Sequence, residues 1–131
     1  FKKSMFLNNY MPKNISPHVQ IYKFPVTAIS SIATRISGVY LSGLFLGYGC
    51  LKLINKEDHA TKIYNERSRL EKFILHQSCI LPMTYHSYGG MRHFLWDHYP
   101  KLLTNSKVAK SSYLLFGLTL GTSMLLEKML V

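Results

Sequence analysis

Charged residues are scarce in this sequence, and acidic residues are the scarcest. Only 17% of the 131 residues are charged, against roughly 25% in typical soluble domains, and Asp and Glu together number 6. The two cysteines, Cys50 and Cys79, lie in or beside different apolar segments without metal-ligand spacing, so we interpret them as packing residues. We find no internal repeat and no alternation typical of a barrel strand. With 47% hydrophobic residues, this composition indicates a chain embedded in lipid rather than a soluble enzyme.

Three apolar stretches follow one another along the chain. Val26–Leu51 contains one charge, Arg35, and Phe73–Met91 contains none. The third stretch, between Lys110 and Glu127, has 16 uncharged residues, close to the roughly 20 that a bilayer requires. Because backbone amides in lipid must bond within their own segment, each stretch is expected to be helical. We predict an all-α integral membrane bundle of three transmembrane helices, about 26–53, 72–97 and 108–130.

The flanking segments suggest how the chain is oriented. Residues 1–24 form a basic arm with Pro12 and Pro17, which favour an extended segment, and residues 25–131 form the membrane domain. The first loop is expected to hold a short amphipathic turn around Ile63–Leu70. With three spans, nine Lys and Arg lie on the amino-terminal side and seven on the other. The positive-inside rule therefore places the amino terminus on the matrix or cytoplasmic side. We assign the net charge of +10 to the membrane surface and not to nucleic acid.

Candidate cofactor ligands concentrate in the second stretch. His86 lies inside an apolar run, where an imidazole is costly without a partner. At about 100° per residue, Gly89, Gly90 and His93 fall near its face, and Arg92 stands at the rim. Glycines beside a histidine leave room for a flat macrocycle, with His86 as the axial ligand of a haem iron and His93 and Arg92 near its propionates. The alternative is equally weighted: His86 bonds to a neighbouring helix and the glycines permit close packing.

The first stretch carries a second polar pair. Ser31 and Arg35 are four residues apart, so a hydroxyl and a guanidinium project from one face near the inner end of the span. Both can donate to the carbonyl oxygens of a quinone, which makes them candidate quinone-binding residues. The alternative, favoured on these two residues alone, is that Ser31 bonds to its own helix and Arg35 reaches lipid phosphate.

Two further features are expected to be architectural. Pro82 removes one hydrogen bond of its helix and is expected to kink it. Gly117 and Gly121 form a small-residue pair on the third helix, which predicts close helix packing.

A set of these residues carries a family resemblance. In order and spacing it comprises Ser16, Pro17 and His18, then Ser30, Ser31, Arg35, Ser37 and Gly38, then Tyr85, His86, Gly90, Arg92, His93, Trp96 and Asp97. The set resembles the cytochrome b large subunit that anchors succinate dehydrogenase. The motifs cover roughly residues 14–100, and the three-helix plan covers the whole chain. One departure is Thr34. Family members often have histidine at this position, directly before the arginine and near a haem propionate, so the haem contact of that histidine does not carry over to this sequence.

The resemblance implies a function for the chain. The histidine matching His86 would ligate haem b, with the second ligand from a small membrane-anchor subunit, and Ser31 and Arg35 would line a ubiquinone pocket. An iron–sulfur subunit and a flavoprotein subunit would complete a succinate:quinone oxidoreductase in the mitochondrial inner membrane, or the bacterial inner membrane in a prokaryote. The chain alone would have no catalytic residues. Two alternatives stay open: a haem-free structural anchor or accessory subunit of a respiratory complex, and a basic protein that binds anionic lipid through its arm.

Overall fold

The computed structural model describes residues 24–130, and this part of the chain is entirely helical. The elements are α1 (Val26–Leu53), α2 (Glu57–Asn65), α3 (Arg69–His98), a short 3-10 helix η2 (Pro100–Leu102) and α4 (Asn105–Leu130). No strand occurs among the described residues. The all-α prediction is therefore confirmed. The predicted basic arm, apart from Phe24, lies outside the described residues.

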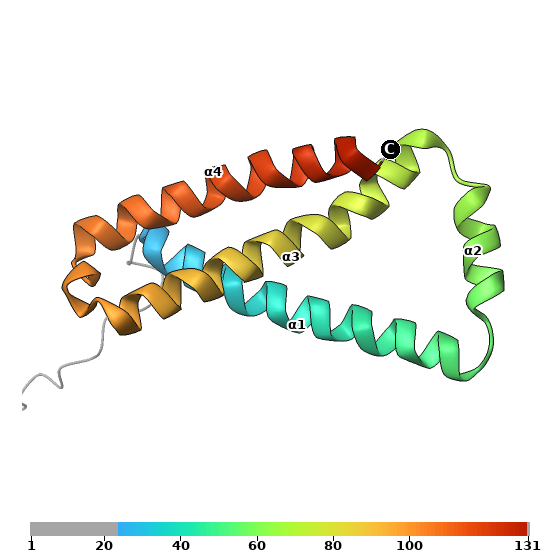
Figure 1. Ribbon diagram of the computed structural model, residues 1–131, viewed down its shortest axis with the longest axis horizontal. Helices are drawn as coiled ribbons and strands as arrows, with labels where there is room; N and C mark the ends of the chain where they lie inside the picture. Colours follow the sequence, from blue (N-terminus) through green and yellow to red (C-terminus); the bar gives the residue numbers. More distant parts are fainter. Residues whose placement is uncertain (1–23, 131) are drawn as a thin grey trace, which may run out of the picture.

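Helix α3 is the central element of the arrangement. It packs against α4 along its length and against α1, while α1 and α4 touch each other less extensively. Figure 1 shows α4 running back along α3, and α1 crossing α3 near one end and diverging from it towards the other. At the divergent end, α2 bridges the gap between the end of α1 and the start of α3 (Figure 1).

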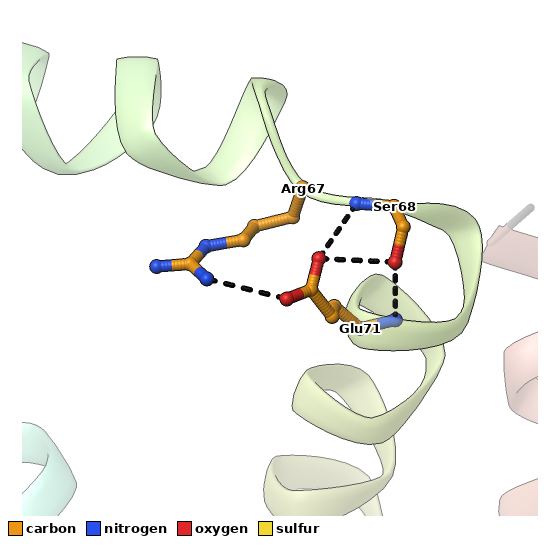
Figure 2. A network of polar contacts seen from close by, with 3 residues as sticks. All are labelled: Arg67, Ser68 and Glu71. Carbon is orange, nitrogen blue, oxygen red and sulfur yellow. Dashed lines mark hydrogen bonds and ion pairs between the residues drawn. The ribbon is translucent and has the colours of Figure 1, made fainter.

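Local sequence explains where α3 begins. The Ser68 hydroxyl accepts a hydrogen bond from the Glu71 amide at 3.4 Å, and the Ser68 amide donates to Glu71 Oε2 at 2.8 Å. This is a capping box, which satisfies amide groups that the first turn leaves without partners (Figure 2). Arg67 Nη1 adds an ion pair to Glu71 at 3.3 Å. The Ser68 and Arg67 hydrogen bonds lower the pKa of Glu71, the Ser68 amide bond contributing most.

The burial pattern is the reverse of that in a soluble protein. Buried residues are mostly polar or charged: Ser30, Thr34, Ser37, Arg92, Ser112, Thr119, Ser123 and Glu127. Large apolar side chains face outwards, with Val39 76% and Leu46 71% exposed. Most buried Ser and Thr hydroxyls bond within their own helices, as when Thr119 Oγ1 donates to the Leu115 carbonyl at 2.8 Å. Small residues inside and apolar residues outside are the pattern expected when lipid surrounds the helices.

Helix α1 has the length and hydropathy of a membrane span. Among the helices that the structure describes, it is the one that meets both criteria, and the apolar window that meets them is 6% buried. Its bounds agree with the predicted helix 26–53. For α3 and α4 the prediction of a membrane span stays a prediction.

Several local predictions need correction. The extra helix in the first loop is α2 at Glu57–Asn65, and not a turn around 63–70, because Ser68 caps α3 and draws Leu70 into it. Helix α3 is one α-helix that contains Pro82, and the predicted kink at this residue stays a prediction. Gly117 and Gly121 are exposed, and an added Cβ at either would meet nothing within 4 Å. Their predicted close packing is therefore wrong within the described chain, since α4 packs through Ser112, Leu115, Thr119 and Ser123. Cys50 and Cys79 are exposed and free, so they do not pack in the interior.

Candidate functional site

His86 lies where α3 crosses α1. Its Nδ1 is 3.0 Å from the Thr34 carbonyl oxygen and 3.3 Å from Ser37 Oγ. Gly38 brings the α1 backbone so close that an added Cβ would stand 2.7 Å from His86 Cε1. The residue itself is exposed at the surface of the bundle. The Nδ1–Cε1 edge of the imidazole is therefore fixed against α1, and Nε2 would stand 3.6 Å from the same added Cβ.

The hydrogen bonds at Thr34 determine which ring nitrogen of His86 carries the proton. A carbonyl oxygen can only accept, so Nδ1 must be the donor in the contact with Thr34. The Ser37 hydroxyl donates its own proton to the same carbonyl at 2.7 Å, which leaves none for Nδ1. A neutral His86 then has an unprotonated Nε2. Metal-binding histidines generally have this arrangement, in which one nitrogen donates to a carbonyl and the other keeps its lone pair for the metal.

The two glycines after His86 have different surroundings. A Cβ at Gly89 would lie 2.8 Å from Thr34 Cγ2, so Gly89 permits the close crossing of α3 and α1. A Cβ at Gly90 would meet nothing within 4 Å. The predicted open glycine surface near His86 is thus present at Gly90 alone, and Gly89 contributes to helix packing.

Arg92 and His93 point in different directions. Arg92 is 8% exposed and lies between α3 and α4, where Nη1 donates to Ser112 Oγ at 3.0 Å. Its guanidinium carbon is 4.6 Å from the centre of the Trp96 ring, and Nε has no hydrogen-bond partner in the described part of the chain. His93 is exposed and meets Trp96 edge to face at 5.2 Å. Of these two residues, His93 lies on the open surface, while Arg92 is committed to the α3–α4 contact.

Ser31 and Arg35 occupy one side of α1. Arg35 is exposed and lies beside Ile36, Val39 and Tyr40 on the open outer surface of α1. Ser31, one turn earlier, is half-buried. Within residues 24–130 neither side chain makes a hydrogen bond, so the prediction that Ser31 bonds to its own helix is not met there, and both donors remain available to a ligand.

Sequence reasoning missed one polar cluster. Tyr64 of α2, His76 of α3 and Glu127 of α4 are joined by hydrogen bonds of 2.7 and 3.1 Å. His76 bonds to α4 whereas His86 bonds to α1, so the two histidines lie on different faces of α3. Glu127, an acidic residue at the end of an apolar run, is the signal in the sequence, but its partners lie 51 and more residues away. Among the described residues no cluster of three His, Cys, Asp or Glu has metal-site geometry.

Comparison with known proteins identifies a family that the sequence matches. Residues 9–126 match a family described as succinate dehydrogenase/fumarate reductase transmembrane subunit. The chain is 32% identical over 104 residues to the mitochondrial succinate dehydrogenase cytochrome b560 subunit of Dictyostelium discoideum, covering 78% of this chain and 54% of that protein. It is 35% identical over 111 residues to the cytochrome b560 subunit of Porphyra purpurea, covering 77% and 84%.

A bacterial relative is similar at a comparable level. The succinate dehydrogenase cytochrome b556 subunit of Paracoccus denitrificans is 34% identical over 86 residues, covering 63% of this chain and 65% of that protein. The chain spans about half the length of the mitochondrial relatives from Dictyostelium discoideum and Mus musculus, at 54% and 56%.

Proposed function

The chain belongs to the family of succinate dehydrogenase and fumarate reductase transmembrane subunits, and from this premise we propose that it is the cytochrome b membrane anchor of a succinate dehydrogenase. The observation that carries the proposal is the setting of His86. Its Nδ1 is bonded to the Thr34 carbonyl at 3.0 Å, and its Nε2 has no hydrogen-bond partner among the described residues, in a residue that is exposed as a whole.

The membrane arrangement that we propose has three spans, formed by α1, α3 and α4. The apolar outer surfaces and small polar contacts of these helices support it, because hydroxyl and glycine contacts hold helices together in lipid. The excess of Lys and Arg on the amino-terminal side supports an amino terminus on the matrix side of the mitochondrial inner membrane, or the cytoplasmic side in a bacterium. Helix α2, which has no buried residue, would then lie at the opposite surface.

The residues around His86 fit a haem b. His86 would supply one axial ligand through Nε2, and a small membrane-anchor subunit would supply the other. Gly90 leaves the backbone uncovered one turn from His86, and His93 lies exposed beyond it. Arg92, held by Ser112, would reach the cofactor only after rearranging, so its predicted role is the less well supported. The haem, when bound, supplies one-electron chemistry whose potential depends on its axial ligands.

Ser31 and Arg35 are proposed to bind ubiquinone. Both side chains are without hydrogen bonds in the described part of the chain, and Arg35 lies beside the exposed apolar side chains of Ile36 and Val39 on α1. The hydroxyl and guanidinium groups would donate hydrogen bonds to the two carbonyl oxygens of the quinone head group. They would stabilise the more negatively charged form of the quinone. An iron–sulfur subunit would deliver electrons that a flavoprotein subunit takes from succinate. The chain by itself would catalyse no reaction.

The quinone role is tested with the assembled complex. In Arg35→Ala we expect quinone reduction to be abolished, while succinate oxidation by an artificial electron acceptor persists. Lys62→Ala, an exposed cation of α2, is the control and should keep both activities. Unaffected quinone reduction in Arg35→Ala would reject the assignment.

The haem role is tested by absorption spectroscopy of the same complex. His86→Gln should remove the reduced haem absorbance, whereas His59→Gln, an exposed histidine of α2, should leave it unchanged. An unchanged reduced spectrum in His86→Gln would rule out His86 as a ligand.

A haem-free structural anchor is the second candidate. It is favoured by Gly89, which packs against Thr34 and shows that the glycine pair serves helix packing at least in part. The same visible spectrum of the purified complex distinguishes the two functions, because a haem-free anchor has no absorbance to lose.

A further inference from the structure

Tyr64, His76 and Glu127 form a hydrogen-bonded chain across three helices, far from His86. Tyr64 Oη is 2.7 Å from His76 Nε2, and His76 Nδ1 is 3.1 Å from Glu127 Oε1. His76 precedes His86 by ten residues, roughly 15 Å along α3. These three residues come from the end of the bundle where α2 joins the starting turns of α3 (Figure 1).

Burial makes Glu127 an unusual carboxyl group. Its side chain is 8% exposed, and Oε2 has no hydrogen-bond partner in the described part of the chain. The ion pairs found for residues 24–130 give it one partner, His76. A buried carboxyl group without further partners is costly in its charged form, and among the described residues His76 is the group within hydrogen-bond distance that can exchange a proton with it. Ionisable groups placed in this way inside membrane proteins often conduct protons.

A cavity connects Tyr64, His76 and Glu127 to the surface of the protein. It has a volume of about 770 Å³ and is lined by all three residues of the chain. Tyr64 is half-buried and stands at the outer end, whereas Glu127 is buried at the inner end. The other charged groups facing the cavity are Arg69 and Lys72 from α3 and Lys128 from α4. Lys72 is occupied by the Asn65 carbonyl at 3.2 Å and lies over the Tyr64 ring at 5.2 Å.

We propose that Tyr64, His76 and Glu127 form a proton-exchange site at the α2 end of the bundle, distinct from the residues assigned to haem and quinone. In uptake, Tyr64 passes its hydroxyl proton to His76 Nε2 and takes one from cavity water. His76 passes its Nδ1 proton to Glu127 Oε1. One proton enters from water and no electron moves.

The hydrogen bonds of the chain reverse their direction after this transfer. Glu127 then donates to His76 Nδ1, and His76 Nε2 donates to Tyr64 Oη. Both polarities satisfy the same contacts of 2.7 and 3.1 Å, because a phenol and a neutral imidazole can each donate and accept. The site can therefore hold a proton in two states without moving a helix.

The test is an infrared titration of the purified complex between mildly alkaline and mildly acidic pH. The wild-type spectrum is expected to contain a carboxylic acid C=O band that grows on acidification and moves in D2O. Glu127→Gln should lack this band. Glu66→Gln, an exposed carboxyl group at the end of α2, should retain it. A wild type and a Glu127→Gln variant with identical titrations would overturn the proposal.

A second variant keeps the test decisive if Glu127→Gln fails to assemble. Tyr64→Phe keeps the ring against His76 and removes the hydroxyl, so it should change the proton concentration at half-titration by about fivefold, the effect of one ordinary hydrogen bond. Tyr48→Phe, an exposed tyrosine of α1, should leave it unchanged. A Tyr64→Phe titration equal to that of the wild type would refute the proposal that the proton passes through Tyr64 and His76 to Glu127.

Discussion

Gly38→Ala changes the setting of His86 without changing its chemistry. The added Cβ would stand 2.7 Å from Cε1, 3.2 Å from Nδ1 and 3.6 Å from Nε2 of the imidazole. Carbon atoms in contact normally lie about 3.5–4.0 Å apart, so the ring or α1 must move by about 1 Å. Such a movement takes Nδ1 out of hydrogen-bond range of the Thr34 carbonyl, now at 3.0 Å. Overpacking of this kind costs about 1–3 kcal/mol.

The assay is the reduced haem absorbance and the thermal stability of the assembled complex. Gly38→Ala is expected to lower the melting temperature and to weaken or displace the haem band, because Nε2 is no longer oriented. Gly43→Ala is the matched control on the same helix, since its Cβ would meet nothing within 4 Å. A Gly38→Ala complex with the spectrum and melting temperature of the Gly43→Ala complex would refute the reasoning.

Two further predictions concern α3. Gly89→Ala places a Cβ 2.8 Å from Thr34 Cγ2, so it should lower the melting temperature, while the control Gly121→Ala in α4, with open space around it, should not. Equal melting temperatures would contradict the assigned packing role. At the start of the helix, the folded-state pKa of Glu71 is lowered, so its stabilising effect is present above its ordinary pKa of 4.5 and is lost as the pH falls through the folded value. Glu71→Gln, which cannot titrate, should remove this acid dependence from hydrogen exchange of the first turn of α3, and an unchanged pH profile would argue against the capping box.

Much of the fold was predictable because helix boundaries here follow from polarity. The bounds predicted for the first helix agree with α1, since charged residues mark the end of the apolar run. The sequence did not predict α2 as a helix, because this segment contains no apolar run. Helix α2 also makes few tertiary contacts. Its attachment depends on single polar contacts such as Lys52 with Glu57 at 3.8 Å and Tyr64 with His76.

The candidate site was predictable in its residues but not in its contacts. Helical periodicity places His86, Gly89 and Gly90 near one face, but it cannot say where a second helix crosses. The crossing of α1 separates the two glycines, so Gly89 is covered by Thr34 and Gly90 is open. Arg92 shows the same limit. Its place at the end of an apolar run suggested an exposed rim, yet α4 covers it through Ser112.

The polar groups of α3 also explain why this bundle is specific. Successive turns contact alternating neighbours: His76 bonds to α4, Tyr85 and His86 to α1, and Arg92 to α4. In lipid, apolar surface gives little preference for one helix pairing over another, so these bonds and the glycine contacts must select the arrangement. A substitution of His86 therefore removes a helix contact together with the proposed haem ligand. Gly38→Ala retains the imidazole and disturbs its position, so the haem spectrum of this variant tests whether the proposed ligand role depends on the contact of His86 with α1.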